Sequence, residues 1–281
     1  MKPVLAKLRS APAPLRISAF ALLLLSLWLP LALPLRWLIR DPNLASIVTL
    51  VILYAQFIWL VQVWGNRVHH QPHVLRSYGL IPSRRNGLLV LRGFGIGLGS
   101  VLILLAFQTI VGWIHWQPPT SGIFQIVIEG LLVALAFGLA EELLFRGWML
   151  DELERDYVAD AALWINAILF AALHLRLWTL PSLVLLGAAL VWAKRSHGET
   201  RVGRRYNLLG LPIGLHAGLV YGNYVVEVGK LIQYSDRVPA WIIGIDRNPL
   251  AGLIGFIFMA GLAVGMQRYA TLHSHQASSK L

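Results

Sequence analysis

Residues 44–64, LASIVTLVILYAQFIWLVQVW, form a run of 21 residues without a charged side chain. An α-helix of this length rises about 30 Å, which is the thickness of the hydrocarbon core of a bilayer. A transmembrane β-strand would instead have about ten residues of alternating polarity, and this run does not alternate. Because lipid offers the backbone no hydrogen-bond partners, the run predicts a membrane-spanning helix.

Similar apolar runs recur along the chain. Hydrophobic residues make up 57% of the sequence and charged residues only 13%, whereas a soluble domain has about 25% charged residues. The predicted fold is therefore all-α, a polytopic bundle of about eight membrane helices. The apolar segments are 17–35, 44–64, 93–114, 123–146, 161–175, 177–193, 208–226 and 249–267.

The basic residues lie beside these segments, which argues against nucleic acid as the partner of a chain with a net charge of +11. With a cytoplasmic N-terminus, 18 of the 24 Lys and Arg residues fall on the inner side, as the positive-inside rule predicts. Both termini are thus expected in the cytoplasm, and the protein in the cell membrane, with an uncleaved first span. The six basic residues on the outer side are Arg36, Arg40, Arg176, Lys230, Arg237 and Arg247.

Ionisable residues inside apolar segments are concentrated after residue 120. Each costs about 2.5–3.5 kcal/mol to insert in a membrane helix, so a cluster of them indicates a functional site or mutual pairing. We therefore predict accessory membrane helices in residues 1–115, a functional core in residues 116–270 and a polar cytoplasmic tail in residues 271–281.

The core contains the stretch 140–147, AEELLFRG. Glu142 and Arg146 are four residues apart, so they share a helix face and can pair. Glu141 points roughly 100° away and lacks that partner. A carboxylate without a charged partner, removed from water, readily takes up a proton, which favours Glu141 as a general base. The alternative is that all three side chains reach water at the inner interface.

Two histidines occur in the apolar segments that follow. Asn166, Phe170 and His174 recur every four residues and therefore share a helix face. His216 is flanked by small residues that allow another helix to approach closely. A single such histidine is better explained by a hydrogen bond to neighbouring backbone, but two histidines beside two acids favour a site.

Together these residues resemble the CAAX protease and bacteriocin-processing family of intramembrane proteases, which has three motifs on successive helices. The motif Glu-Glu-x-x-x-Arg is matched at residues 141–146, and Phe-x-x-x-His at residues 170–174. The third, His-x-x-x-Asn, begins at His216, but its asparagine position is Val220. Asn223 lies on nearly the same helix face as His216 and is a candidate substitute.

The resemblance implies a metallo- or glutamate-type endopeptidase that hydrolyses a peptide bond within the membrane. It implies that one divalent ion, such as zinc, can be held by Glu141, His174 and His216, or that these residues activate water without a metal. The substrate would be a membrane-associated protein or peptide, prenylated or not, and the active site is expected to face the cytoplasm. The implied catalytic residues are Glu141, Glu142, Arg146, His174 and His216, with Asn223, Asn166 and Phe170 as auxiliary or oxyanion-binding residues.

Two other functions remain open at this stage. Buried acids and histidines also build proton-coupled transporters, although the chain has no evident inverted repeat. A catalytically inactive membrane scaffold or immunity protein is the other alternative, and Val220 is its main support.

Depth in the membrane presents a difficulty for the protease. If the fourth segment runs inward and the fifth outward, Glu141 lies near the cytoplasmic end and His174 near the opposite end. Their meeting requires a displaced fifth helix or a cytoplasmic extension of the fourth.

Other signals receive simpler interpretations. Gly93, Gly95, Gly97 and Gly99 predict close helix packing rather than a dinucleotide loop. His69 and its neighbours are expected in a solvated connector. The absence of cysteine excludes disulfides, thiolate metal sites and cysteine nucleophiles.

Overall fold

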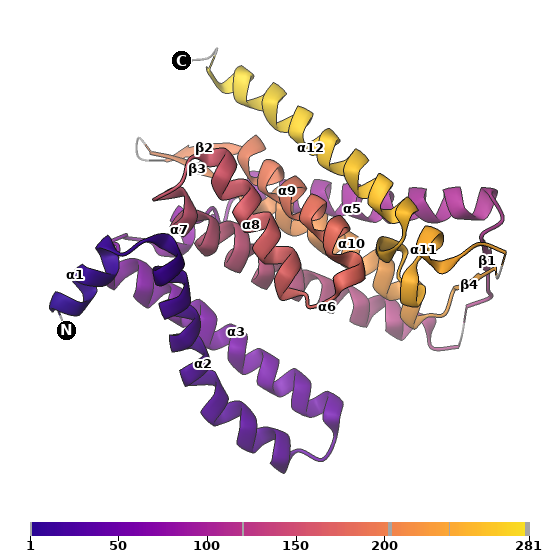
Figure 1. The fold of residues 1–281 in the computed structure, drawn as a ribbon, viewed down its shortest axis with the longest axis horizontal. Helices are drawn as coiled ribbons and strands as arrows, with labels where there is room; N and C mark the ends of the chain where they lie inside the picture. The colour runs from indigo at the N-terminus through magenta and orange to yellow at the C-terminus, as the bar shows by residue number, and fades with distance from the viewer. Residues whose placement is uncertain (1, 120, 202–203, 236, 279–281) are drawn as a thin grey trace. The chain divides into compact units, whose positions relative to one another are not determined.

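The computed structural model describes residues 2–119, 121–201, 204–235 and 237–278. They form two compact units, Met1–Ser77 with Asp151–Tyr157, and Tyr78–Leu150 with Val158–Leu281. Helices dominate both units (Figure 1). The predicted all-α polytopic class is confirmed, because six helical stretches in the described residues are long and apolar enough to span a membrane. These are Ala13–Leu38, Leu44–Arg67, Arg84–Ile110, Ile123–Glu154, Leu177–Ser196 and Leu253–His273.

The first unit is built on a pair of long helices. It contains α1 (Lys2–Ser10), α2 (Ala13–Leu38), α3 (Pro42–Arg67) and α4 (Val74–Ser77). The pair α2 and α3 lie side by side, as Figure 1 shows. Phe20 on α2 packs edge-on against Phe57 and Trp64 on α3, with ring centroids 6.1 and 5.4 Å apart.

A buried carboxylate, Glu152, ties this unit together. It accepts hydrogen bonds from Arg16 Nε at 2.6 Å and Trp64 Nε1 at 2.8 Å. His69 Nε2 lies 2.6 Å from its Oε1 atom. The prediction that His69 lies in a solvated connector is therefore wrong, because its acidic partner is 83 residues away in sequence.

The second unit contains the remaining elements and two short antiparallel strand pairs. Strand β1 (Ile114–Trp116) pairs with β4 (Ile232–Tyr234), with His115 opposite Gln233. Strand β2 (Gly198–Arg201) pairs with β3 (Arg204–Asn207), with Glu199 opposite Tyr206. The helix α7 (Leu150–Glu154) begins in the second unit and ends in the first. The other elements are α5 (Arg84–Ile110), β1 (Ile114–Trp116), α6 (Ile123–Glu142), the π-helix η1 (Leu143–Met149), α8 (Ala159–Leu173), η2 (Leu177–Thr179), α9 (Leu180–Ser196), β2 (Gly198–Arg201), β3 (Arg204–Asn207), α10 (Gly210–Val228), β4 (Ile232–Tyr234), α11 (Ala240–Ile243), η3 (Ile245–Arg247), η4 (Pro249–Ala251) and α12 (Leu253–Ser278).

The helix α10 is the centre of the second unit. It packs against α5, α6 and α9, and its first ten residues are all buried. Glycines allow the backbones of α5 and α10 to approach closely. A Cβ atom at Gly97 of α5 would overlap the Leu215 carbonyl, and one at Gly214 of α10 would overlap the Val90 carbonyl. This confirms close packing at Gly93 and Gly97, whereas Gly95 and Gly99 face open space.

Each of the eight predicted apolar segments is largely helical, but two are not among the six long apolar helices. The 15 residues of α8 rise only about 22 Å, which is too short for a span. The other is α10, which is enclosed by protein. The predicted tail continues α12 as far as Ser278, and residues 279–281 lie outside the described residues.

The compact units do not divide at residue 115. The first ends at Ser77, and α5 belongs to the second unit because it packs against α10. An accessory role for residues 1–115 thus stays a prediction, and α5 helps to position the core.

Candidate active site

A wide helical turn follows the two adjacent acids. Residues Leu143–Met149 form a π-helix between α6 and α7, and such segments are frequent at functional sites. Backbone carbonyls of this segment accept side-chain hydrogen bonds from neighbouring helices. Asn166 Nδ2 of α8 donates to the Phe145 carbonyl at 2.8 Å, and Lys194 Nζ of α9 donates to the Arg146 carbonyl. The wide turn is thus held by two other helices.

Glu142 and Arg146 form the predicted ion pair. Arg146 Nη1 donates to Glu142 Oε1 at 2.8 Å, and both side chains are fully buried. Arg146 Nη2 donates to the Gly187 carbonyl at 3.2 Å, and its guanidinium lies 4.3 Å from the centre of the Phe170 ring. Each charge therefore has a partner, which lowers the cost of burying both.

Both histidines are oriented through their Nδ1 atoms. His216 Nδ1 lies 2.8 Å from Glu142 Oε1, and His174 Nδ1 lies 2.7 Å from the Phe170 carbonyl. A carbonyl and an ionised carboxylate only accept hydrogen bonds, so both Nδ1 atoms donate. In each neutral ring, Nε2 then carries a lone pair.

These two Nε2 atoms converge on Glu141. Its Oε2 atom lies 3.8 Å from His216 Nε2 and 3.9 Å from His174 Nε2. The same oxygen is buried and accepts no hydrogen bond from the described part of the chain. Three acceptor atoms facing one space favour a species that donates hydrogen bonds or carries positive charge, such as water, a proton or a cation.

The helical stretch that carries Glu141 continues beyond the predicted fourth segment, which explains how Glu141 and His174 meet at one depth. Glu141 lies 13 residues before the end of the helical stretch Ile123–Glu154, about 20 Å along its axis. His174 directly follows α8, which rises about 22 Å from the turn before it. The fourth segment is therefore extended, and Glu141 and His174 meet because both lie a similar distance from that turn.

The ring of Phe170 contacts both histidines and the buried arginine of the site. Its ring makes edge contacts with His174 and His216, with centroids 4.6 and 5.9 Å apart, and its face lies under Arg146. Asn166 lies one turn earlier on α8 and is fully buried. The amide of Asn166 holds the π-helix and is not among the residues that line the cavity, so its predicted oxyanion or auxiliary role stays a prediction.

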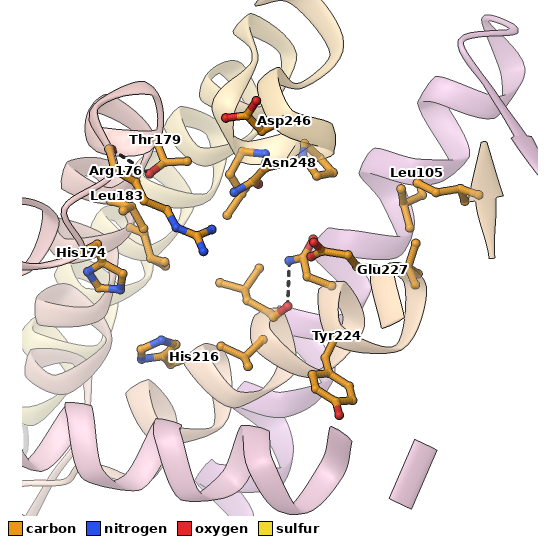
Figure 2. Close-up of a pocket in the computed structure, with 18 of the residues that line it drawn as sticks. Leu105, His174, Arg176, Thr179, Leu183, His216, Tyr224, Glu227, Asp246 and Asn248 are labelled. Atoms are coloured by element: carbon orange, nitrogen blue, oxygen red, sulfur yellow. Dashed lines mark hydrogen bonds between the residues drawn. The ribbon is translucent and has the colours of Figure 1, made fainter. Parts of the chain in front are cut away.

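The two histidines line a cavity of about 1160 Å³, part of which Figure 2 shows. Its volume is that of a large ligand pocket. Burial and the Glu227 carboxylate raise the pKa of Tyr234 to about 12, so this lining phenol keeps its proton. The apolar lining includes Leu105, Leu183, Leu186 and Leu219, and the charged lining consists of Arg176, Glu227, Lys230 and Asp246.

Sequence reasoning missed Arg176, which lies two residues after His174. The intervening Leu175 has a φ of 54° and an exposed fraction of 89%. This left-handed conformation is unfavourable for a leucine. Figure 2 shows the Arg176 side chain extending into the cavity beside His174. The spacing alone did not reveal it, because a regular helix would have turned Arg176 away from His174.

The third motif supplies no polar group at its last position. Val220 and Asn223 both line the cavity. Asn223 Nδ2 donates to the Leu219 carbonyl at 2.9 Å, which leaves its second N–H available. Asn223 therefore remains a candidate for the role that Val220 cannot fill.

The donor atoms of the site are of the types that bind zinc, but the distances between them are longer than those around a bound zinc ion. Bonds of 2.0–2.1 Å to a tetrahedral zinc ion place donor atoms ~3.3 Å apart, about half an ångström less than the separations at Glu141. Within the described ranges, no group of three or more His, Asp or Glu residues could hold a metal ion as it stands. The bonds from both Nδ1 atoms to oxygen are nevertheless typical of zinc-bound histidines.

Comparison with known proteins identifies one family. Residues 123–222 match the sequence model described as type II CAAX prenyl endopeptidase Rce1-like. The matched segment contains all five predicted catalytic residues, and it ends just before Asn223. No curated protein and no solved structure matches the chain. The match confirms the resemblance indicated by the motifs.

Proposed function

Because residues 123–222 match the model of Rce1-like type II CAAX prenyl endopeptidases, we propose that this chain is an intramembrane endopeptidase that uses Glu141 as its base. The observation that carries the proposal is the convergence of Glu141 Oε2, His174 Nε2 and His216 Nε2. All three atoms can accept a hydrogen bond. The two imidazole rings are held in place by the hydrogen bonds of their Nδ1 atoms. A water held there is surrounded by acceptors, which makes it a stronger nucleophile.

The proposed reaction moves one proton through Glu141. Its carboxylate takes a proton from the water while the water oxygen bonds to the substrate carbonyl carbon. The resulting tetrahedral intermediate collapses, the carbon–nitrogen bond breaks, and the protonated Glu141 returns the proton to the leaving amine. Glu142 and Arg146 stay paired and hold His216 in position.

The negative oxygen of the intermediate needs a donor other than the two histidines. Their neutral rings present lone pairs at Nε2 and so accept rather than donate. Arg176 and Asn223 both line the cavity and have N–H groups that can face the substrate. We propose that Arg176 is the main donor, because a charged donor forms a stronger hydrogen bond than an amide.

Zinc is the alternative to activation by Glu141 alone. Glu141, His174 and His216 would hold it, and the ion would polarise the carbonyl or lower the pKa of a bound water. Elemental analysis of the purified protein tests this alternative. If zinc binds, the wild-type protein and the Glu129→Gln variant should each contain about one ion per chain, and the His174→Ala variant should contain none. A metal-free protein with full activity would contradict the zinc alternative.

A cleavage assay in proteoliposomes tests the proposed function. Its two substrates are a farnesylated peptide with a C-terminal CAAX sequence and the same peptide anchored by a transmembrane helix. We expect cleavage of at least one, with loss of activity in Glu141→Gln and His174→Ala. Glu129→Gln is the matched control, because this exposed acid lies on the same helix and accepts a hydrogen bond from Gln125, away from the site. Equal cleavage by Glu141→Gln would remove Glu141 from the mechanism.

An inactive membrane scaffold is the second candidate, because Val220 replaces the family asparagine. It predicts no cleavage of either substrate by the wild-type protein. It also predicts that Val220→Asn creates activity. In the protease, that substitution only adds a donor to a working site, so the two candidates give different results.

A further inference from the structure

A second pocket lies at the start of α5, apart from the cavity that contains the histidines. Its volume is about 530 Å³. We call it the basic pocket, and it is lined by Arg84, Arg85, Leu88, Leu89, Arg92 and His197. Three of its six residues carry a permanent positive charge, and none is acidic.

The arginines of the basic pocket lack an acidic partner in the part of the chain that the structure describes. Within the described residues, none of Arg84, Arg85 and Arg92 forms an ion pair. Glu199 accepts a hydrogen bond from the hydroxyl of Ser83, the residue before α5, at 3.0 Å, but it does not line the pocket. Arg92 instead lies over an aromatic ring, with its guanidinium 5.3 Å from the centre of Tyr269.

The positive charge of the pocket affects the pKa of His197, which lines it. Burial, together with the nearby His273, Arg85 and Arg92 side chains, lowers the pKa of His197 to about 4. Its neutral ring stacks with those of Tyr269 and His273, with centroids 5.5 and 5.2 Å apart. The pocket thus combines three arginines with a neutral imidazole in its lining.

The position of the pocket along α5 matters because this helix is a candidate membrane span. Arg92 lies about 12 Å along the axis from Arg84, so it extends from the interface towards the apolar zone. A cation there is costly without an anion. On the same helix Leu88 and Leu91 are 54% and 69% exposed, which offers apolar surface just beside the charges.

From this combination we infer that the basic pocket binds the head group of an anionic phospholipid. The phosphate would lie between Arg85 and Arg92, and an acyl chain would follow Leu88 and Leu91. Charge complementarity and the exposed leucines carry the inference, since a soluble phosphate would gain nothing from the leucines. The inner leaflet, where the sequence places these arginines, is where such lipids are enriched. This inference goes beyond the proposed function and does not depend on it.

Native mass spectrometry of the full-length protein in dodecyl maltoside tests this site. The probes are dioleoyl phosphatidylglycerol, dioleoyl phosphatidylcholine and inorganic phosphate. We expect preferential binding of phosphatidylglycerol and a loss of roughly 30-fold in its affinity in the Arg85→Gln/Arg92→Gln variant, or about 1 kcal/mol per arginine. The matched control is Arg67→Gln/Arg76→Gln, which removes two exposed arginines predicted on the same side of the membrane.

Three results would overturn the inference: equal binding of the two lipids, unchanged affinity in the pocket variant, or an equal loss in the control. Hydrogen exchange on the wild-type protein locates the site even if the variant does not fold. Phosphatidylglycerol should protect the backbone of residues 84–92, and phosphatidylcholine should not. Equal protection by inorganic phosphate would identify a soluble anion site and exclude the lipid.

Discussion

Glu142 Oε1 lies 2.8 Å from His216 Nδ1 and also accepts a hydrogen bond from Arg146 at 2.8 Å. One buried oxygen therefore holds both the guanidinium and an imidazole that faces Glu141. The two adjacent acids consequently have separate tasks. Glu142 is a positioning residue within the protein, and Glu141 faces the space where a substrate water would lie.

Glu142→Gln should destabilise the protein strongly. The substitution leaves the Arg146 charge fully buried without its partner, so we expect a loss of about 3–5 kcal/mol in the free energy of unfolding. Denaturation by sodium dodecyl sulfate in mixed micelles measures it. The double variant Glu142→Gln/Arg146→Met removes both charges and should recover part of the loss. Equal stability of the single and double variants would show that the unpaired Arg146 charge is not the cause of the loss.

Glu141→Gln should leave the stability of the protein nearly unchanged but lower its activity strongly. The buried Oε2 atom has no hydrogen bond to lose among the described residues, so we expect the unfolding free energy to change by less than about 1 kcal/mol. Loss of a general base should lower kcat by roughly 10²–10⁴. Parallel unfolding and cleavage measurements separate the two effects. A variant that unfolds as readily as Glu142→Gln would indicate a structural role for Glu141.

Arg176→Gln should lower kcat more than it raises KM, because an oxyanion donor acts mainly in the transition state. We expect a decrease of about 10²-fold, the size seen for loss of one such donor. Lys230→Gln is the control, since it removes another cation that lines the cavity. Partial recovery of Arg176→Ala by added guanidinium would support a chemical role. Equal effects of the two glutamine variants would point to general electrostatics.

Gly97→Ala should disrupt the close contact between α5 and α10. An added Cβ would overlap the backbone at Leu215, next to His216, so Gly97→Ala should cost about 1–3 kcal/mol and lower kcat. Gly95→Ala is the control on the same helix, where a Cβ meets nothing within 4 Å. It should be neutral or stabilising by up to about 1 kcal/mol. Thermal unfolding and the cleavage assay compare them, and equal behaviour of the two variants would contradict the packing argument.

The sequence predicted those features that depend on local periodicity. Apolar runs located the helices because each run must satisfy its own backbone in lipid. The spacing of four residues predicted the Glu142 and Arg146 pair, and small residues predicted the close approach of α10 to its neighbours. All of these can be read within one or two helical turns.

Features that depend on irregular backbone or distant contacts could not be predicted in this way. No periodic signal marks the π-helix after Glu142, because its extra residue per turn is supported by Asn166 and Lys194 from other helices. The inward direction of Arg176 follows from the φ of Leu175, and the burial of His69 follows from Glu152. Each needs the packed structure to be known first.

Membrane orientation is a prediction that the absence of cysteine makes testable. The charge count places Arg176 and Lys230 outside, yet both line the cavity, whereas the active site was expected to face the cytoplasm. These two predictions disagree. We expect the charge count to hold, because it draws on 24 basic residues. A membrane-impermeant maleimide should then label Gln233→Cys in right-side-out vesicles, and Ser10→Cys only after permeabilisation. The reverse labelling would place the termini outside and open the cavity to the cytoplasm.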